Sequence, residues 1–368
     1  MSWFDRPSTR RGFLTSAGLG ALGLGALAAC GGGGSAGSAG SAGASSAAAA
    51  PSSVAPGTYG KLSLQLSWIK NIEFAGEFFA DSKGYYKDAG FDSVDLVTGP
   101  VDSADALVVA GTVDVGLSAP DATARLVAEQ GAPLKIIGAT FQKNPFCILS
   151  LEEGKPIRTL ADLGGKTIGI QAGTNQSIFE GLLKANNIDP STIKTTVVQY
   201  EPTPLTEKKI DGFMAYLTNE PFIVKAKGFT PVTLSFADNG LPLASETFCV
   251  LQDTIENDRD KLKAFLAAEI KGWSDAVADP AAGAKLAAET YGKGLGLDVA
   301  GQTEQLEAQL KLVVSDDTKA NGLFTLTPEF QDKIVAAIGA LGTQISAADL
   351  FDMSLLDEVY AGDPSLKA

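Results

Sequence analysis

The sequence predicts an α/β protein built of two lobes. Strand-like and helix-like segments alternate from Lys61 to Gln252, an order typical of a parallel sheet with helices on both faces. The alternation begins again at Thr159, and the stretches 111–122 and 208–221 each end a helix, form a short strand and open into a polar loop. We therefore expect two lobes with equivalent loops, followed by a purely helical segment.

The expected elements of the first half have local causes. The segment 71–83 has phenylalanines on one helical stripe and stops at Gly84. Ser103 is the expected N-cap of a second helix, and Pro120 opens a third. The alternating or continuous apolar runs between them predict strands at 62–68, 93–99, 113–118 and 134–140.

The second half repeats this pattern. A capped helical turn at 159–164 precedes helices expected at 175–184, 205–209 and 220–227. Strands are expected at 166–173, 195–200, 210–217 and 232–237. Two further strands, 146–150 and 246–252, are expected to leave the first lobe and to return to it.

The first 58 residues predict export and a tether. Arg10 and Arg11 begin a twin-arginine pattern, and residues 18–29 form an apolar run too short to span a bilayer. Leu27 to Cys30 resembles a bacterial lipobox, so we expect a signal at 1–30 and a lipid on Cys30; an uncleaved anchor helix is the alternative. Residues 31–58 are nearly all Gly, Ala and Ser, which predicts a flexible tether.

Composition excludes several classes of function. The 368 residues carry a formal charge of −14 without any basic run, so nucleic acid is not an expected partner. The chain has no histidine, which excludes Ser-His-Asp and Cys-His catalysis and histidine-bound metals. We expect no cofactor and no catalytic residue. Cys147 and Cys249 lie in strand-like runs and are either two buried thiols or a disulfide.

In facing α/β lobes, a ligand binds beyond the carboxyl ends of the strands. Trp68 ends the first expected strand, where an indole can stack on a flat ligand. Polar residues at other strand exits or helix starts are further candidates for ligand contact, with helix capping as the alternative role: Asn71, Glu73, Ser118, Asp121, Gln142, Gly173, Thr174, Asn175, Tyr216, Asn219 and Glu220.

These candidates predict the chemistry of the ligand. They offer aromatic faces, amides and carboxylates but no arginine, which a sulfonate or nitrate would require. Arg125 and Arg158 are the nearest arginines in sequence, and both fit surface positions. The set suits a small flat heterocycle that carries amino or ring N–H groups.

Three stretches, 65–92, 113–122 and 213–221, resemble the NMT1/THI5-like, SsuA-related solute-binding proteins of ABC importers. The resemblance runs from Lys61 to Tyr360 and implies a type II periplasmic-binding fold, with a first lobe of 59–147 and 246–368 and a second lobe of 148–245. It implies two crossing hinge strands, with Cys147 and Cys249 close in space, and a helical C-terminal segment packed on the first lobe.

The resemblance also implies a function. Members of the family carry pyrimidine precursors of thiamine, and relatives carry riboflavin-like or sulfonate ligands. Stacking and amino-group recognition carry over to Trp68, Tyr216, Asn219 and Glu220. The expected partners are the ligand, an ABC permease and its ATPase subunits. The protein is expected to be a lipid-anchored monomer outside the bacterial cell membrane.

One branch of the family consists of enzymes that make the thiamine pyrimidine from pyridoxal phosphate and one of their own histidines. They also carry a cysteine-rich motif near the position of 245–252. This chain has no histidine and only Cys249 in that stretch, so the synthase reaction cannot run here in that form.

Overall fold

The computed structural model describes residues 54–99, 101–172 and 174–367. The expected signal at 1–30, the lipidation at Cys30, most of the tether and Gly173 lie outside the described residues. The two sheets described below belong to one unit, residues 50–368. Among the helices that the structure describes, none is long and apolar enough to cross a membrane.

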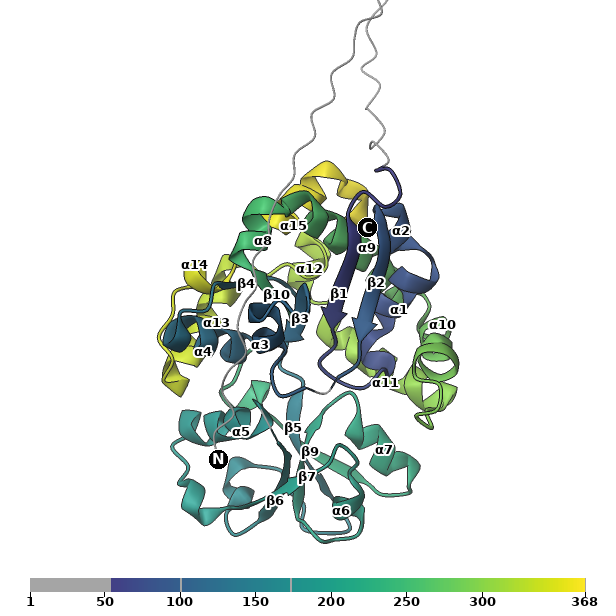
Figure 1. Cartoon of the computed structure of the whole chain (residues 1–368). Coiled ribbons are helices and arrows are strands. Elements are labelled where there is room, and N and C mark those ends of the chain that lie inside the picture. The colour runs from purple at the N-terminus through teal and green to yellow at the C-terminus, as the bar shows by residue number, and fades with distance from the viewer. Residues whose placement is uncertain (1–53, 100, 173, 368) are drawn as a thin grey trace, which may run out of the picture. The chain divides into compact units, whose positions relative to one another are not determined.

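The first sheet has the strand order β2-β1-β3-β10-β4 (Figure 1). Strands β1, β2 and β3 are parallel, whereas β10 runs antiparallel to both β3 and β4. The sheet is therefore mixed rather than purely parallel, because its last strand arrives from the other half of the molecule. The strands are β1 (Gly60–Gln65), β2 (Phe91–Val97), β3 (Val115–Ser118), β4 (Leu134–Phe141) and β10 (Ser245–Leu251).

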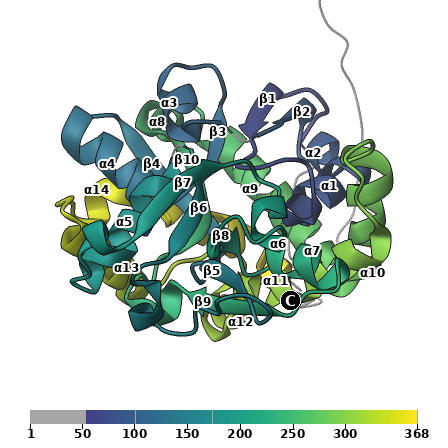
Figure 2. The same cartoon turned by 90° about the horizontal axis from the view of Figure 1, so that it is seen from below.

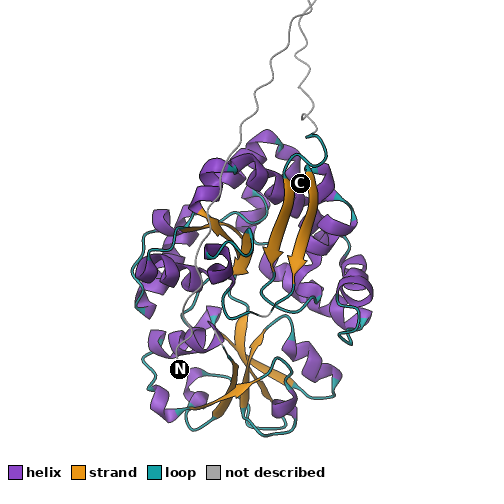
Figure 3. Cartoon of the chain, viewed as in Figure 1, coloured by secondary structure: helices purple, strands orange, loops and turns teal. Residues whose placement is uncertain are grey.

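The second sheet has the order β7-β6-β8-β5-β9. Strands β6, β7 and β8 are parallel, and β5 runs antiparallel to both β8 and β9. Both sheets are flanked by helices (Figure 3). The strands are β5 (Phe146–Leu151), β6 (Thr167–Gln171), β7 (Lys194–Val198), β8 (Gly212–Tyr216) and β9 (Pro231–Ser235).

We call the first sheet with its helices the first lobe, and the second sheet with its helices the second lobe. Between β1 and β4 the first lobe contains η1 (Ile72–Phe74), α1 (Ala75–Ser82), α2 (Tyr85–Asp88), α3 (Ala104–Val109) and α4 (Pro120–Gln130). The second lobe contains η2 (Leu160–Leu163), α5 (Thr174–Ala185), η3 (Pro190–Thr192), α6 (Thr203–Thr206), α7 (Glu220–Ala226) and η4 (Ala237–Asn239).

The chain changes lobe in two loop segments, 142–145 and 236–244, that precede β5 and β10. We expected the strands 146–150 and 246–252 themselves to make the crossings. Each strand instead pairs entirely within one sheet, since β5 lies between β8 and β9, and β10 lies between β3 and β4.

The C-terminal segment after β10 is helical. Its helices are, in chain order, α8 (Gln252–Asn257), α9 (Arg259–Ala278), α10 (Pro280–Lys285), η5 (Leu286–Tyr291), α11 (Val299–Val313), α12 (Asp316–Asn321), α13 (Pro328–Leu341), α14 (Ala347–Leu350), α15 (Ser354–Gly362) and η6 (Pro364–Lys367). These helices pack mainly on the first lobe, as expected. Two of them also reach the second lobe, because α11 contacts α7 and α13 contacts α5 (Figure 2).

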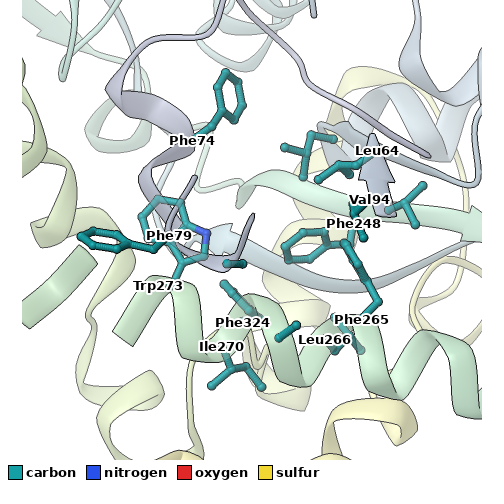
Figure 4. Close-up of a cluster of buried hydrophobic side chains, with 14 of the residues drawn as sticks. Leu64, Phe74, Phe79, Val94, Phe248, Phe265, Leu266, Ile270, Trp273 and Phe324 are labelled. Carbon is teal, nitrogen blue, oxygen red and sulfur yellow. The ribbon is translucent and has the colours of Figure 1, made fainter. Parts of the chain in front are cut away.

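The core of the first lobe forms around α1 and α9. The aromatic stripe that predicted a helix at 71–83 is buried, and Phe79 lies near Trp273 of α9 (Figure 4). The two helices come into backbone contact at Gly76 and Gly272, where an added Cβ on Gly272 would lie 2.1 Å from the Gly76 oxygen. Only glycine permits this approach.

The expected ends of the first strand and of the first helix were wrong. Strand β1 ends at Gln65, so Trp68 lies in the following turn rather than in the strand. The expected helix at 71–83 is divided into η1 and α1. The division follows from side-chain contacts, because Asn71 accepts a hydrogen bond from the Glu73 amide, and the Ile72 amide donates to Gln302 of α11.

Candidate functional site

A cleft of about 910 Å³, including its open mouth, lies between the two lobes. Residues that follow or end strands β1, β3, β6 and β8 line it, together with the starts of β5, β10, α3, α5 and α7. This is where an α/β sheet is expected to bind a ligand, beyond the carboxyl ends of its parallel strands.

Seven of the twelve sequence-predicted residues line this cleft: Trp68, Glu73, Ser118, Asn175, Tyr216, Asn219 and Glu220. The turn after β1 supplies Trp68, and η1 supplies Glu73. The second lobe supplies aromatic and polar side chains from the exit of β8 and the start of α7.

Three predicted residues of the described part of the chain do not line the cleft. Asn71 caps η1, and the Gln142 side chain donates to the Ala139 carbonyl within the first crossing. Asp121 is buried in α4 and lies 3.7 Å from Arg125. Thr174 begins α5, and Gly173 lies outside the described residues.

Sequence reasoning missed several lining residues, of which Glu246 is the most important. Glu246 is 3% exposed and lies near the start of β10 with φ +49°, a conformation that non-glycine residues rarely adopt. Its signal was a charged residue at the start of the expected strand 246–252. Ser67, Asp102, Asp105, Phe146, Gln171 and Ser245 were also missed.

The Glu246 carboxylate has a defined set of partners. Its Oε2 accepts a hydrogen bond from the Ser67 hydroxyl at 2.8 Å, and its Oε1 accepts one from the Tyr216 hydroxyl at 3.4 Å. Burial raises the pKa of Glu246 to about 7, although hydrogen bonds from Ser67, Glu73 and Tyr216 act in the opposite direction.

Glu73 lies beside Glu246 and is 5% exposed. Burial raises the pKa of Glu73 well above its ordinary value, and the neighbouring carboxyl groups of Glu246, Glu220 and Glu77 raise it further. The Oε1 atom of Glu73 is buried and has no hydrogen-bond partner among the described residues. Glu73 therefore gives up its proton less readily than an exposed glutamate does.

Glu220 is the third buried glutamate of the cleft. Its Oε2 accepts a hydrogen bond from the Tyr216 amide at 2.8 Å, and its Oε1 accepts one from the Asn219 side chain at 3.3 Å. Burial raises the pKa of Glu220 to about 7, although the hydrogen bond from the Tyr216 amide acts in the opposite direction. Glu220 is therefore both a cap for its own loop and a cleft acceptor.

Two of the other polar lining residues are occupied by partners within their own lobe. Asp105 accepts hydrogen bonds from Ser118 and Thr123, so the Ser118 hydroxyl points to a carboxylate. Asn175 donates to the Gln171 side chain at 2.9 Å. These contacts order the cleft wall and leave fewer of its polar atoms free for a ligand.

The two lobes contact each other around the cleft. Trp68 of the first lobe meets Tyr200 of the second edge to face, with ring centroids 6.1 Å apart. The Tyr216 hydroxyl lies 3.3 Å from the Ser245 hydroxyl. At the periphery, Arg125 donates to Ser177 at 3.2 Å. These contacts cross between lobes and would change if the lobes moved apart.

The two buried cysteines are free. Cys147 lies in β5 of the second sheet, and Cys249 lies in β10 of the first, each in its own apolar cluster. The disulfide alternative was therefore wrong, and the two thiols lie in different sheets and different apolar clusters. Burial raises the pKa of both thiols well above its ordinary value.

The cleft is acidic. Glu73, Asp102, Asp105, Glu220 and Glu246 line it, and none of the lining residues that the structure describes is a lysine or arginine. Arg125 lies outside it, and Arg158 forms an exposed ion pair with Glu152. No group of His, Cys, Asp and Glu suited to a metal occurs within residues 54–99, 101–172 and 174–367. The cleft can accept hydrogen bonds from N–H groups and offer aromatic faces.

Curated relatives carry two kinds of name. The chain is 25% identical to the "Riboflavin-binding protein RibY" of Chloroflexus aurantiacus, over 82% of this chain and 87% of that protein. It is also 25% identical to the "4-amino-5-hydroxymethyl-2-methylpyrimidine phosphate synthase" of Schizosaccharomyces pombe, over 60% of this chain and 66% of that protein.

The fold and the family are clear from two further comparisons. The periplasmic nitrate-binding protein NrtA of Synechocystis PCC 6803 has the same fold, with a TM-score of 0.58 at 13% identity over 84% of this chain and 91% of that one. This confirms the expected periplasmic-binding fold. The family model described as "NMT1/THI5 like" matches residues 71–283, which is more than half of the chain. The chain therefore belongs to the NMT1/THI5-like family.

Proposed function

We propose that the chain is the extracytoplasmic solute-binding component of an ABC importer and that it captures an aminopyrimidine precursor of thiamine. The observation that carries the proposal is the acidic, aromatic cleft between the lobes, with three buried glutamates and no basic residue among its described lining. Carboxyl groups hold N–H donors, and aromatic faces stack on flat rings. Sulfonates and nitrate are disfavoured, because they need arginine or a nest of N–H groups.

The roles of individual residues follow from their places in the cleft. Trp68 and Tyr216 supply ring faces from opposite lobes, and Asn219 and Glu220 supply an amide and a carboxyl group for amino hydrogens. Because both lobes contribute, the ligand completes its contacts only when the lobes are together. Binding therefore favours closure, with the segments 142–145 and 236–244 as the hinge.

The cellular location of the protein is part of the same proposal. A twin-arginine signal exports the folded body, and a lipid on Cys30 holds it at the outer face of the cell membrane, where it works as a monomer with a permease and its ATPase subunits. Fractionation of bacteria that express the wild-type chain and Cys30→Ala tests the anchor. We expect the wild type in the membrane fraction and the variant in the soluble extracytoplasmic fraction.

Riboflavin-like ligands are the second candidate class, favoured by similarity to the Chloroflexus aurantiacus protein over 82% of this chain. The transport role is the same in both cases. An enzyme that makes the thiamine pyrimidine is the rival of a different class, given the name of the Schizosaccharomyces pombe relative. The absence of histidine from all 368 residues argues against it.

A thermal-shift panel on the purified full-length protein tests the proposal. Its ligands are 4-amino-5-hydroxymethyl-2-methylpyrimidine, thiamine, riboflavin, an alkyl sulfonate and pyridoxal phosphate. A ligand that binds the native state raises the melting temperature by mass action. We expect a shift with the aminopyrimidine. A shift with riboflavin alone would replace the ligand, and consumption of pyridoxal phosphate would replace the whole proposal with an enzyme.

A further inference from the structure

Two carboxyl groups meet in the cleft, those of Glu73 from η1 and Glu246 from β10. Both side chains are almost fully buried and line the same cleft, and each carboxyl group lies close enough to the other to shift its pKa. Two ionised carboxylates that lie close together repel each other strongly when water is excluded, so such a pair retains one proton.

No lysine or arginine is among the described residues that line the cleft beside this pair. The groups that face Glu73 are the carboxyl groups of Glu77 on α1, Glu220 on α7 and Glu246, together with the Tyr216 hydroxyl on β8. Glu246 faces Ser67 and Tyr216 in addition to Glu73. All of these groups are acidic or neutral, so a proton is what compensates the charge of the pair.

The fold holds the two groups in place. Helix α11 fixes the turn that carries Glu73, since Gln302 accepts from the Ile72 amide at 2.8 Å and Gln309 donates to the Glu73 carbonyl at 3.0 Å. Glu246 is held in a left-handed backbone conformation, and strain of this kind persists where the surroundings enforce it. The pair is thus a built feature of the cleft rather than two mobile surface acids.

The remaining oxygens of the pair differ in their contacts. Both oxygens of Glu246 receive hydrogen bonds from Ser67 and Tyr216. In contrast, Oε1 of Glu73 is buried among lining residues of the cleft without a partner among the described residues. A protonated carboxyl group can donate from one oxygen and accept at the other, whereas a carboxylate can only accept.

We infer that Glu73 and Glu246 bind the ligand as a pair that carries one proton, with Glu73 donating O–H to a ring nitrogen and Glu246 accepting from the neighbouring amino group. This inference rests on the proposed function and narrows its ligand class. The ligand is an uncharged heterocycle in which an acceptor ring nitrogen adjoins an exocyclic amino group. No bond to carbon forms or breaks, and the proton remains shared between Glu73 and the ligand nitrogen.

The inference predicts how affinity changes with pH. The pair can donate only while it keeps its proton, so affinity is present at neutral pH and is lost as the pH rises through the raised pKa of the folded pair. Calorimetric titration of the full-length protein with 4-amino-5-hydroxymethyl-2-methylpyrimidine, from about pH 7 to about pH 9.5, measures this loss. For the wild type we expect a fall of about tenfold or more, as loss of one proton predicts.

Variants of Glu73 distinguish the effect of its proton on affinity from the effect of its side-chain shape. Glu73→Gln keeps an N–H donor and a carbonyl acceptor at every pH, so it should bind the aminopyrimidine with affinity that does not fall with pH. Glu73→Ala should bind weakly throughout. Glu256→Gln, an exposed position on α8, is the matched control and should behave as the wild type. The pyrimidinone with oxygen in place of the amino group should bind at least about tenfold more weakly.

The outcomes distinguish the inference from the function on which it rests. Wild-type affinity that stays constant or rises with pH, or a Glu73→Gln variant that loses affinity in parallel with the wild type, overturns the inference while the importer function stands. Absence of aminopyrimidine binding at every pH overturns both. Infrared spectra of the free protein add a second readout, because the band of a protonated carboxylic acid should be weaker in Glu73→Gln than in the wild type at neutral pH.

Discussion

The hydroxyl group of Tyr216, from the second lobe, lies 3.4 Å from Oε1 of Glu246 in the first lobe. It also lies 3.3 Å from the Ser245 hydroxyl. One side chain of the cleft wall is therefore joined to the opposite lobe at the start of β10. Side chains that hold the closed arrangement contribute to ligand affinity even where they do not touch the ligand.

Tyr216→Phe should weaken aminopyrimidine binding about five- to tenfold, the effect of one hydrogen bond worth about 1 kcal/mol. The ring of Phe preserves the stacking face, so the loss reports the hydroxyl group alone. Isothermal titration of the wild type and the variant measures the change. Tyr59→Phe, a first-lobe tyrosine away from the cleft, is the control. Equal affinity of Tyr216→Phe and wild type would show that the hydroxyl contacts between the lobes do not matter.

Trp68→Ala should weaken binding by about 1–3 kcal/mol, the range expected for loss of a stacked, partly buried aromatic ring. Trp68 is joined to the second lobe only by its edge-to-face contact with Tyr200 among the aromatic pairs of the described residues. Tyr200→Ala therefore serves as the comparison, because it removes that contact and keeps the indole. If both variants lose affinity equally, Trp68 acts in closure and not as a stacking surface.

Stability should fall as the pH rises from about 5 to about 8, because several glutamates of the core and cleft keep protons in the folded state. Glu269 is the clearest case. Burial raises its pKa to about 8, even though the Tyr86 hydroxyl donates to it. Below the pKa that the Glu269 carboxyl group has in the unfolded chain, the group is protonated in both the folded and the unfolded state. Above it the glutamate ionises in the unfolded chain first, and the free energy of unfolding falls by about 1.4 kcal/mol per pH unit and group until the folded pKa is reached.

Glu269→Gln removes one such group. Urea unfolding at about pH 5, 6.5 and 8 should show a smaller decline in the free energy of unfolding for this variant than for the wild type. Glu329→Gln, at an exposed position on α13, is the control and should decline as the wild type does. Parallel curves for Glu269→Gln and wild type would mean that Glu269 is ionised in the folded protein.

Cys147 and Cys249 should resist a thiol reagent in the native protein, because both are fully buried and their pKa is raised. After unfolding in urea without a reductant, both should be labelled, as peptide mapping by mass spectrometry will show. If the peptides that contain Cys147 and Cys249 stay unlabelled until a reductant is added, the two cysteines form a disulfide. That result would contradict the structure, in which the two strands belong to separate sheets.

The sequence predicted the order of elements well, because strands and helices of this chain carry strong local signals. The periodic phenylalanines of 71–83, the Ser103 cap and Pro120 all mark helices that the structure contains. The sequence could not place the crossings, since β5 and β10 look like any buried strand. Which sheet each joins depends on partners far away in the chain.

The sequence could predict those site residues that lie at the carboxyl ends of strands. Trp68, Tyr216 and Glu220 were found from their positions after strands. Glu246 was missed because it lies at the start of its strand rather than at the exit, and only the antiparallel direction of β10 brings that end to the cleft. Asn71 looked like a ligand contact but caps η1. A side chain suited to both roles has no sequence signal that separates them.

The most direct test of the account is calorimetric titration of the full-length protein with 4-amino-5-hydroxymethyl-2-methylpyrimidine, riboflavin and an alkyl sulfonate under the same conditions. The account predicts a single site for the aminopyrimidine, with affinity lowered in Trp68→Ala and Tyr216→Phe, and no heat of binding for the sulfonate. Binding of the sulfonate in preference to the aminopyrimidine would contradict the central claim, because a cleft with three buried glutamates and no described basic lining residue should reject an anion.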